Sequence, residues 1–430
     1  MNTNLLAVIV IGAGHAGLSA SYFLKQHRIQ HVVLERGLIG ESWASQRWDS
    51  FRMNTANKLN TLPGWETDET EPDSFGTAQN LVASMKQYVQ NYGLPVLTNT
   101  TVISLRKAPG SELFEIQTVQ NGSTKTYSCW QVIVASGAQS QKQPARLAGK
   151  IDAKIKQLHS SEYRTAADLP AGGVLVVGSA QSGCQIAEDL ILAGRIVYLS
   201  TSRVPRCPRY YRGKDIMDWL ILTGFFNVRS EDIADSAQLH VRTPLLKGND
   251  NGRKTLSLQS LARSGVILLG KLQDVVNDFA YFSEDAGAHV SFADEFSAQV
   301  KGFIDNFIAE KHLPAPTAEP DPDDEPDNSL NLSGHPGSIQ FRKEGISTII
   351  WATGFRPAMA YIQLPVFDET GNPVHQQGKS LVKGLYFLGL PWLRNRKSSL
   401  LLGIKEDAQF ITGCINTLVQ KQTMVGNQPD

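Results

Sequence analysis

Residues 5–36 decide the fold, and they read LLAVIVIGAGHAGLSASYFLKQHRIQHVVLER. The first seven are apolar without a break, which is typical of a central parallel strand that is covered on both faces. Residues 16–27 then show helical periodicity, and residues 31–35 are expected to form the next strand. The stretch therefore predicts a strand, a helix and a second parallel strand of an α/β sheet.

A glycine-rich turn, residues 12–17, joins the first strand to the helix. Gly12 permits the tight turn, Gly14 lets the backbone approach a pyrophosphate, and Gly17 allows close packing of the helix, whose N-terminus attracts the phosphates. Glu35 ends the next strand, where a carboxylate accepts hydrogen bonds from a ribose diol and repels a 2′-phosphate, so FAD or NAD fits and NADP does not. The candidate residues of this first dinucleotide site are Gly12, Gly14, His15, Ala16, Gly17, Glu35 and Arg36.

A second strand, glycine turn, helix and strand follow over residues 173–200, so the chain contains two related nucleotide-binding units. The turn has Ala180 where the middle glycine is expected, which adds one methyl group where backbone meets phosphate. The next strand ends in hydroxyls and Arg203 without a carboxylate, which suits a 2′-phosphate and favours NADPH over NADH. The candidate residues of this second site are Gly178, Ser179, Gln181, Ser182, Gly183, Ser202 and Arg203.

Composition limits the class of protein. The chain has 430 residues, enough for two domains, and its 41 Lys plus Arg equal its 41 Asp plus Glu, so no overall charge favours nucleic acid as a partner. The four cysteines lie far apart and the nine histidines have no ligand spacing, so we expect no metal. Residues 5–11 are too short for a membrane span and have no basic region before them. We therefore expect a cytoplasmic protein without a membrane span.

The tandem units resemble two-domain flavoproteins, and more closely the flavin-containing (class B) monooxygenases of the bacterial and plant branch that includes the YUCCA-type enzymes. The resemblance covers nearly the whole chain. Its landmarks are residues 40–43, 158–163, 208–214, 389–393 and 406–408. The family fingerprint F-x-G-x-x-x-H-x-x-x-Y survives only as His159 and Tyr163, a pair better interpreted as a linker than as proton carriers. The redox cysteine pair of disulfide reductases is absent.

The resemblance implies further site residues. Asn54 aligns with an Asn that lies near the flavin in the family, and Asn57 is the second candidate; both also suit turn or cap chemistry in a loop. These two are the predicted catalytic residues. The further predicted cofactor-binding residues are Ser42, Trp43, Val102, Ala135, Gly137, Ala352, Thr353 and Gly354.

The predicted architecture is two Rossmann-like dinucleotide-binding domains, with the NADPH domain inserted into the FAD domain. Residues 1–165 and 335–430 are assigned to the FAD-binding domain, because a strand near residue 351 returns the chain to that domain in related flavoproteins. Residues 166–313 are assigned to the NADPH-binding domain. Residues 314–334, rich in proline and acidic residues, are expected to form a linker or loop.

By resemblance, NADPH reduces FAD, oxygen adds to the reduced ring as a C4a-(hydro)peroxyflavin, and one oxygen atom passes to a small organic substrate. N- or S-oxygenation and Baeyer-Villiger or decarboxylation chemistry stay open, as does a homodimer. Two alternatives also remain: an NADPH:flavin oxidoreductase or oxidase that releases hydrogen peroxide, and a non-catalytic dinucleotide-binding sensor. The partners expected for the enzyme are the small-molecule substrate and molecular oxygen.

Overall fold

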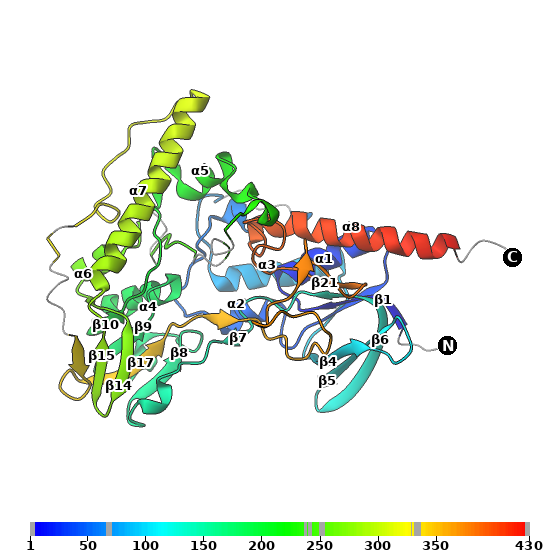
Figure 1. The fold of residues 1–430 in the computed structure, drawn as a ribbon, viewed down its shortest axis with the longest axis horizontal. Helices are drawn as coiled ribbons and strands as arrows, with labels where there is room; N and C mark the ends of the chain where they lie inside the picture. The colour runs from blue at the N-terminus through cyan, green and yellow to red at the C-terminus, as the bar shows by residue number, and fades with distance from the viewer. Residues whose placement is uncertain are drawn as a thin grey trace.

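A computed structural model describes residues 5–65, 71–235, 239, 243–248, 254–327, 329–330 and 337–425. Two sheets built on parallel strands lie next to each other along the long axis of the molecule, and helices cover their faces (Figure 1). The predicted α/β class with two Rossmann-like units is confirmed.

The first sheet is built around β1 (Leu5–Ile11), which pairs in parallel with β2 (His31–Leu34) and β6 (Ser123–Val134). Val8 and Val10 are buried against α1 (His15–Gln26) and α8 (Leu401–Val425), whereas Ile9 and Ile11 are buried in a separate cluster with Phe114 and Ile116. The strand order is β19-β20-β21-β6-β1-β2-β3, and β4 and β5 extend antiparallel from β6. Its other strands and helices are β3 (Val96–Leu97), β4 (Thr101–Lys107), β5 (Phe114–Gln120), β19 (His375–Gln376), β20 (Lys379–Ser380), β21 (Leu385–Phe387), α2 (Glu41–Ser45) and α3 (Ala78–Tyr92).

The second sheet has the order β13-β10-β9-β17-β8, and all of its pairs are parallel. Its centre is β9 (Gly173–Val177), flanked by β10 (Val197–Ser200) and β17 (Ile346–Trp351). The helix α4 (Gln181–Leu192) follows β9 as α1 follows β1. The remaining elements of this half are β8 (Lys156–His159), β13 (Ile267–Leu269), β14 (Leu272–Val276), β15 (Phe279–Phe282), β16 (Ser338–Gln340) and α6 (Leu258–Arg263).

The strand pairing corrects the expected position of two strands. We placed β8 and β17 in the first domain, but both belong to the second sheet, where Trp351 lies opposite His159 and Val177. A central strand of a parallel sheet forms hydrogen bonds with a neighbouring strand on each edge, and residues 346–351, far away in the chain, pair with one edge of β9. The chain crosses between the sheets at β7 (Gln141–Lys142) and β18 (Phe355–Arg356), which pair with each other.

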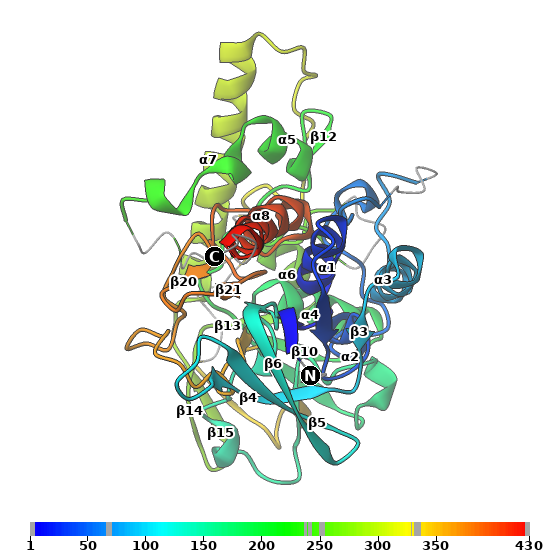
Figure 2. The ribbon, with the colours of Figure 1, turned by 90° about the vertical axis from the view of Figure 1, so that its right-hand side faces the viewer.

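A helical projection rises from the second sheet. The long helix α7 (Ala286–Lys311) packs beside α5 (Ile216–Leu222) and the short hairpin of β11 (Tyr210–Tyr211) and β12 (Lys214–Asp215) (Figures 1 and 2). Residues 314–327 form turns and irregular backbone alongside it, whereas residues 331–334 of the predicted linker lie outside the described residues. Among the helices described, none has the length and apolar character needed to cross a membrane.

Candidate dinucleotide and flavin site

The first glycine turn uses each glycine for a different reason. Gly12 has φ +107°, and a Cβ there would lie 2.5 Å from the carbonyl oxygen of Ala135. A Cβ on Gly17 would lie 1.8 Å from the Gly12 oxygen, so α1 packs too closely on the turn for any side chain. Around Gly14 a Cβ would meet nothing within 4 Å, so this position opens outward at the helix N-terminus, where a phosphate binds.

Glu35 fixes the same turn from the end of β2. Its buried carboxylate accepts hydrogen bonds from the N–H groups of Ala13 (2.7 Å) and Gly37 (2.9 Å). Each carboxylate oxygen has a second lone pair, so ribose hydroxyls can still be bound. Arg36 instead is exposed and donates to the carbonyl of Ser140.

The second glycine turn repeats the first one contact by contact. Gly178 has φ +109°, and a Cβ there would lie 2.6 Å from the carbonyl oxygen of Ala352. A Cβ on Gly183 would lie 1.9 Å from the Gly178 oxygen. Ala352 therefore supports the second turn as Ala135 supports the first. We had expected the strand before Ala352 to return the chain to the first domain, but that strand, β17, pairs with β9 of the second sheet.

Ala180 fits the second turn without strain. It precedes α4 with φ −76° and ψ 178°, close to the φ −81° and ψ −175° of Gly14 before α1. Extended angles of this kind are open to any residue. The substitution therefore affects the space beside the phosphate site and leaves the backbone path unchanged.

The other predicted residues of the second site divide into two groups. Ser179 is buried and its hydroxyl bonds the backbone N–H (2.9 Å) and O (3.2 Å) of Ser202, which ties the turn to the end of β10. The Gln181 amide bonds the backbone N–H of Leu246 (3.0 Å) and the carbonyl of Lys247 (2.6 Å). These side chains hold the site together. The second group, Ser182 and Arg203, is accessible to a ligand.

Arg203 is exposed, with its guanidinium 4.2 Å from the centre of the Phe292 ring on α7. Arginines stack on aromatic faces while their N–H groups point outward. The ring thus holds Arg203 beside the end of β10, where a ribose 2′-phosphate of a dinucleotide on the second turn would lie.

The segment after β2 reaches back to the first turn. The N–H of Gly40, which has φ +70°, donates to the carbonyl of Ala13 (3.1 Å). The short helix α2 starts there and carries Ser42 and Trp43, both half-buried. The contacts of Gly40 thus place α2 at the same end of the first sheet as the glycine turn.

Three buried polar atoms close to this segment have no hydrogen-bond partner among the described residues: Gln46 Oε1, Trp48 Nε1 and Asn54 Oδ1. Buried polar groups are rarely left unpaired, and each unpaired one costs free energy. A flavin ring presents hydrogen-bond donors and acceptors along one edge, so the residues present fit an FAD bound at the first turn.

The two catalytic candidates differ in their surroundings. Asn57 uses both ends of its amide in the loop: Oδ1 accepts from Gly76 N–H (3.0 Å) and Nδ2 donates to the Glu71 carbonyl (3.1 Å). Asn54 has its side-chain oxygen buried and unpaired, and its backbone carbonyl accepts from Arg209 (3.0 Å). These contacts favour Asn54 as the residue facing a ligand and give Asn57 a structural role.

A chain of contacts connects Asn54 with the second turn. Arg209 is fully buried, pairs with Asp215, and stacks on Phe75 at 4.7 Å. Lys247 lies on the same ring at 4.8 Å, and its carbonyl binds Gln181. Arg209 is thus taken up by an internal carboxylate, that of Asp215, six positions further along the chain.

The late segment crosses the start of α1. A Cβ on Gly389 would lie 2.7 Å from the Ala16 Cβ, and the His15 Nε2 lies 3.0 Å from the Ser399 carbonyl oxygen. Burial lowers the pKa of His15, so its ring is neutral near pH 7. Both predicted residues of the first site therefore position the late segment.

The remaining predicted residues lie around the crossing between the sheets. Thr353 donates to the Gln143 carbonyl (3.3 Å), and the Gly354 carbonyl binds His159 Nε2 (3.0 Å), which agrees with a linker role for this histidine. Gly137 has φ +81° and open space around it after β6. Val102 lies on β4, half-buried.

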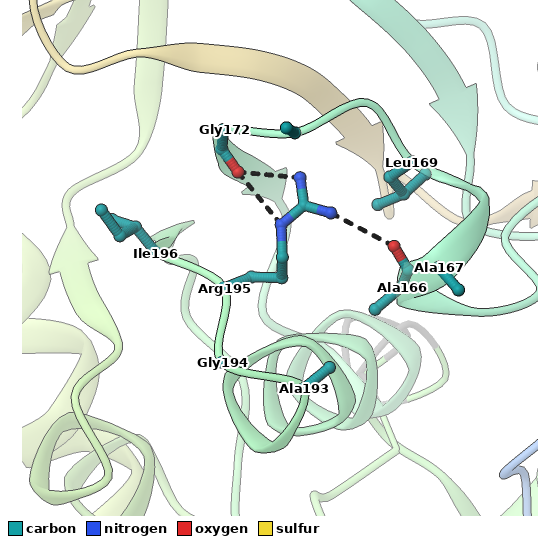
Figure 3. A pocket seen from close by; sticks show the side chains of 9 residues that line it. Ala166, Ala167, Leu169, Gly172, Ala193, Gly194, Arg195 and Ile196 are labelled. Atoms are coloured by element: carbon teal, nitrogen blue, oxygen red, sulfur yellow. Dashed lines mark hydrogen bonds between the residues drawn. The ribbon is translucent and has the colours of Figure 1, made fainter.

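A surface hollow of about 610 Å³ lies elsewhere, at the amino end of β9 (Figure 3). Arg195 crosses it and donates to the carbonyls of Gly172 and Ala166 (Figure 3). Dinucleotides bind at the carboxyl ends of parallel strands. This hollow is therefore separate from the candidate site. Arg195 stabilises the loops there through its hydrogen bonds to their carbonyls.

Two glycine turns on two parallel sheets, each opening at the carboxyl end of its first strand, define the class of two-domain dinucleotide-binding flavoproteins. A family profile described as pyridine nucleotide-disulphide oxidoreductase matches residues 9–215. The uncharacterised oxidoreductase CzcO-like of Geobacillus kaustophilus is 30% identical over 412 residues, which are 95% of this chain and 97% of that protein. The probable indole-3-pyruvate monooxygenase YUCCA10 of Arabidopsis thaliana is 28% identical over 213 residues, 49% of this chain and 54% of its own.

Solved structures share the fold. A flavin monooxygenase mutant from Stenotrophomonas maltophilia covers 97% of this chain and 100% of its own with a TM-score of 0.66 at 18% identity. OTEMO in complex with FAD and NADP covers 99% and 87% with a TM-score of 0.57 at 15% identity. The chain belongs to the family of the CzcO-like oxidoreductases.

Proposed function

We propose that the protein oxidises NADPH bound at the second turn, reduces FAD bound at the first, and transfers one atom of molecular oxygen to a small organic substrate. The observation that carries this proposal is the duplicated glycine turn with two different strand ends. Glu35 closes the first site and disfavours a 2′-phosphate, whereas Ser202 and the stacked Arg203 close the second and favour one. Two such sites on one chain suit a hydride donor and a flavin acceptor.

The bound FAD supplies hydride acceptance and oxygen activation, and the protein supplies binding, orientation and exclusion of water. The helix N-terminus at Gly14 would hold the diphosphate of FAD, and the buried polar atoms of Gln46, Trp48 and Asn54 would bind the polar edge of its ring. The Asn54 amide would donate a hydrogen bond in the pocket where oxygen reacts. Arg209 fixes the backbone of Asn54 and so aligns that amide.

The alternatives of an oxidase and a sensor are separated by one experiment. Purified protein is mixed anaerobically with NADPH or NADH while the visible absorption of the oxidised flavin is followed. The reduced protein is then exposed to ¹⁸O₂ with a panel of sulfides, amines and ketones. We expect NADPH to bleach the flavin faster than NADH and one ¹⁸O atom to appear in product. Label found only in hydrogen peroxide would contradict the monooxygenase, and a flavin that neither nucleotide reduces would favour the sensor.

A further inference from the structure

Arg47 belongs to the segment of the candidate flavin site, and no carboxylate of the described residues pairs with it. Among those residues its guanidinium donates to two neutral oxygens, the Gln46 carbonyl (3.1 Å) and Gln139 Oε1 (3.2 Å). It lies over the rings of Trp43 (4.8 Å) and Phe51 (5.4 Å). Removal from water lowers the pKa of this guanidinium to about 10, and it stays charged at pH 7.

Its contacts place Arg47 beside the first glycine turn. Its side chain is half-buried, and removal from water lowers its pKa. Gln139, its hydrogen-bond partner, comes three residues after Ser136, whose Cα lies 3.2 Å from where a Cβ on Gly12 would be. Tyr361, also half-buried, donates to the Ser136 hydroxyl (3.2 Å).

An uncompensated charge in such a place is costly unless a ligand brings the opposite charge. The unpaired atoms of Gln46, Trp48 and Asn54 belong to the same segment and are neutral, which suits the ring edge of a flavin. Hydride transfer breaks the C4–H bond of the nicotinamide and forms an N5–H bond on the flavin. The two electrons and the proton that move leave one negative charge on the flavin and one positive charge on the nicotinamide.

We propose that Arg47 stabilises this negative charge of the reduced flavin and so raises the reduction potential of the bound FAD. The inference rests on the proposed function, because it requires FAD at the first site. Within the segment, Arg47 is a positioning and electrostatic residue, and it is distinct from the predicted catalytic Asn54. Charges close to the flavin ring are a principal means by which proteins tune flavins.

The test compares the wild type with Arg47→Gln, the charge-conserving Arg47→Lys, and Arg342→Gln, a control at an exposed arginine of the second half. Affinities for oxidised and reduced FAD are measured anaerobically, together with the midpoint potential. We expect Arg47→Gln to lose about tenfold in affinity for reduced FAD relative to oxidised FAD, which lowers the midpoint potential by about 30 mV for a two-electron couple. Arg47→Lys should retain most of the wild-type potential, and Arg342→Gln all of it.

Equal losses of affinity for oxidised and reduced FAD would place the guanidinium on the diphosphate and overturn the proposal, as would an unchanged midpoint potential.

The wild type offers a second measurement that does not depend on how the variants fold. If the reduced flavin is bound as an anion, one proton is taken up per two electrons, and the potential falls by about 30 mV per pH unit between pH 6 and 8. A slope of about 59 mV would mean a neutral reduced flavin and contradict the role of Arg47. FAD that binds and is reduced by NADPH upholds the hydride step of the proposed function in either case.

Discussion

The residues of the two glycine turns have nearly the same backbone conformation, although a different cofactor is proposed for each turn. Gly12 and Gly178 have nearly equal positive φ values, and both face the carbonyl of an alanine that ends a neighbouring strand. Where the turns differ, at Gly14 and Ala180, the backbone angles are the same and only a methyl group is added. The difference therefore affects the ligand and leaves the fold unchanged.

Ala180→Gly should strengthen NADPH binding. Removing the methyl lets the backbone N–H groups approach the phosphate, and one improved hydrogen bond of about 1 kcal/mol corresponds to about a fivefold lower Kd. The reciprocal variant Gly14→Ala should weaken FAD binding by a similar factor. Titration of each variant with both cofactors measures this. An unchanged Kd for NADPH in Ala180→Gly would mean that the phosphate lies elsewhere.

Asn54→Ala should increase the hydrogen peroxide released per NADPH oxidised, because the amide that holds the oxygen species is lost. The expected effect is about tenfold or more, the order seen when one such donor is removed. Asn57→Ala is the matched control: it should lower thermal stability by removing the bonds to Gly76 and Glu71 while coupling stays as in the wild type. The measurement is hydrogen peroxide release in parallel with NADPH consumption. The same ratio of peroxide to NADPH in Asn54→Ala and in the wild type would contradict the proposed role of Asn54.

Elements acquire their role through pairing over long sequence distances. The helix α7 contributes Phe292, whose ring supports Arg203 at the end of β10, although the two residues are far apart in the chain. The strand β17 similarly brings Ala352 to the turn before α4. The proposed NADPH site would therefore be assembled from three separated segments.

Arg203→Gln should raise the KM for NADPH by about tenfold, the size of a charge-assisted bond of ~1.5 kcal/mol to the 2′-phosphate, and leave the KM for NADH nearly unchanged. Phe292→Leu should cause a smaller loss in the same direction, since the guanidinium keeps its charge but loses its support. Steady-state kinetics of flavin reduction with NADPH and with NADH give the ratio of the two KM values. A parallel rise of both KM values would mean that Arg203 acts on the fold instead of the phosphate.

At the scale of the whole molecule, a buried ion network joins α7 to the acidic loop 314–327. Arg206 is fully buried and bonds Asp294 (2.6 Å) and Asp324 (2.9 Å), while Lys301 reaches Asp324 at 2.6 Å. Desolvation raises the pKa of Asp294 despite these partners. A segment whose composition indicated solvation is thus anchored at one buried carboxylate.

Asp324→Ala should lower the free energy of unfolding by about 3–5 kcal/mol, because it leaves Arg206 buried with less compensation. Asp323→Ala, which removes the neighbouring and more accessible pair with Arg263, should cost less than about 1 kcal/mol. Chemical denaturation of both variants provides the comparison. Similar costs for the two would show that the loop is not anchored through Asp324.

By itself the sequence determined the features that depend on neighbouring residues: the two strand-turn-helix units, the glycines that only a left-handed or crowded backbone explains, and Glu35 at the end of its strand. These follow from local sterics and hydrophobic periodicity, which a short window contains. Only the tertiary structure decided that β17 belongs to the second sheet and that Arg47 has no carboxylate partner among the described residues. Strand pairing and charge compensation of this kind depend on residues far away in the chain, and no local pattern specifies which of them meet.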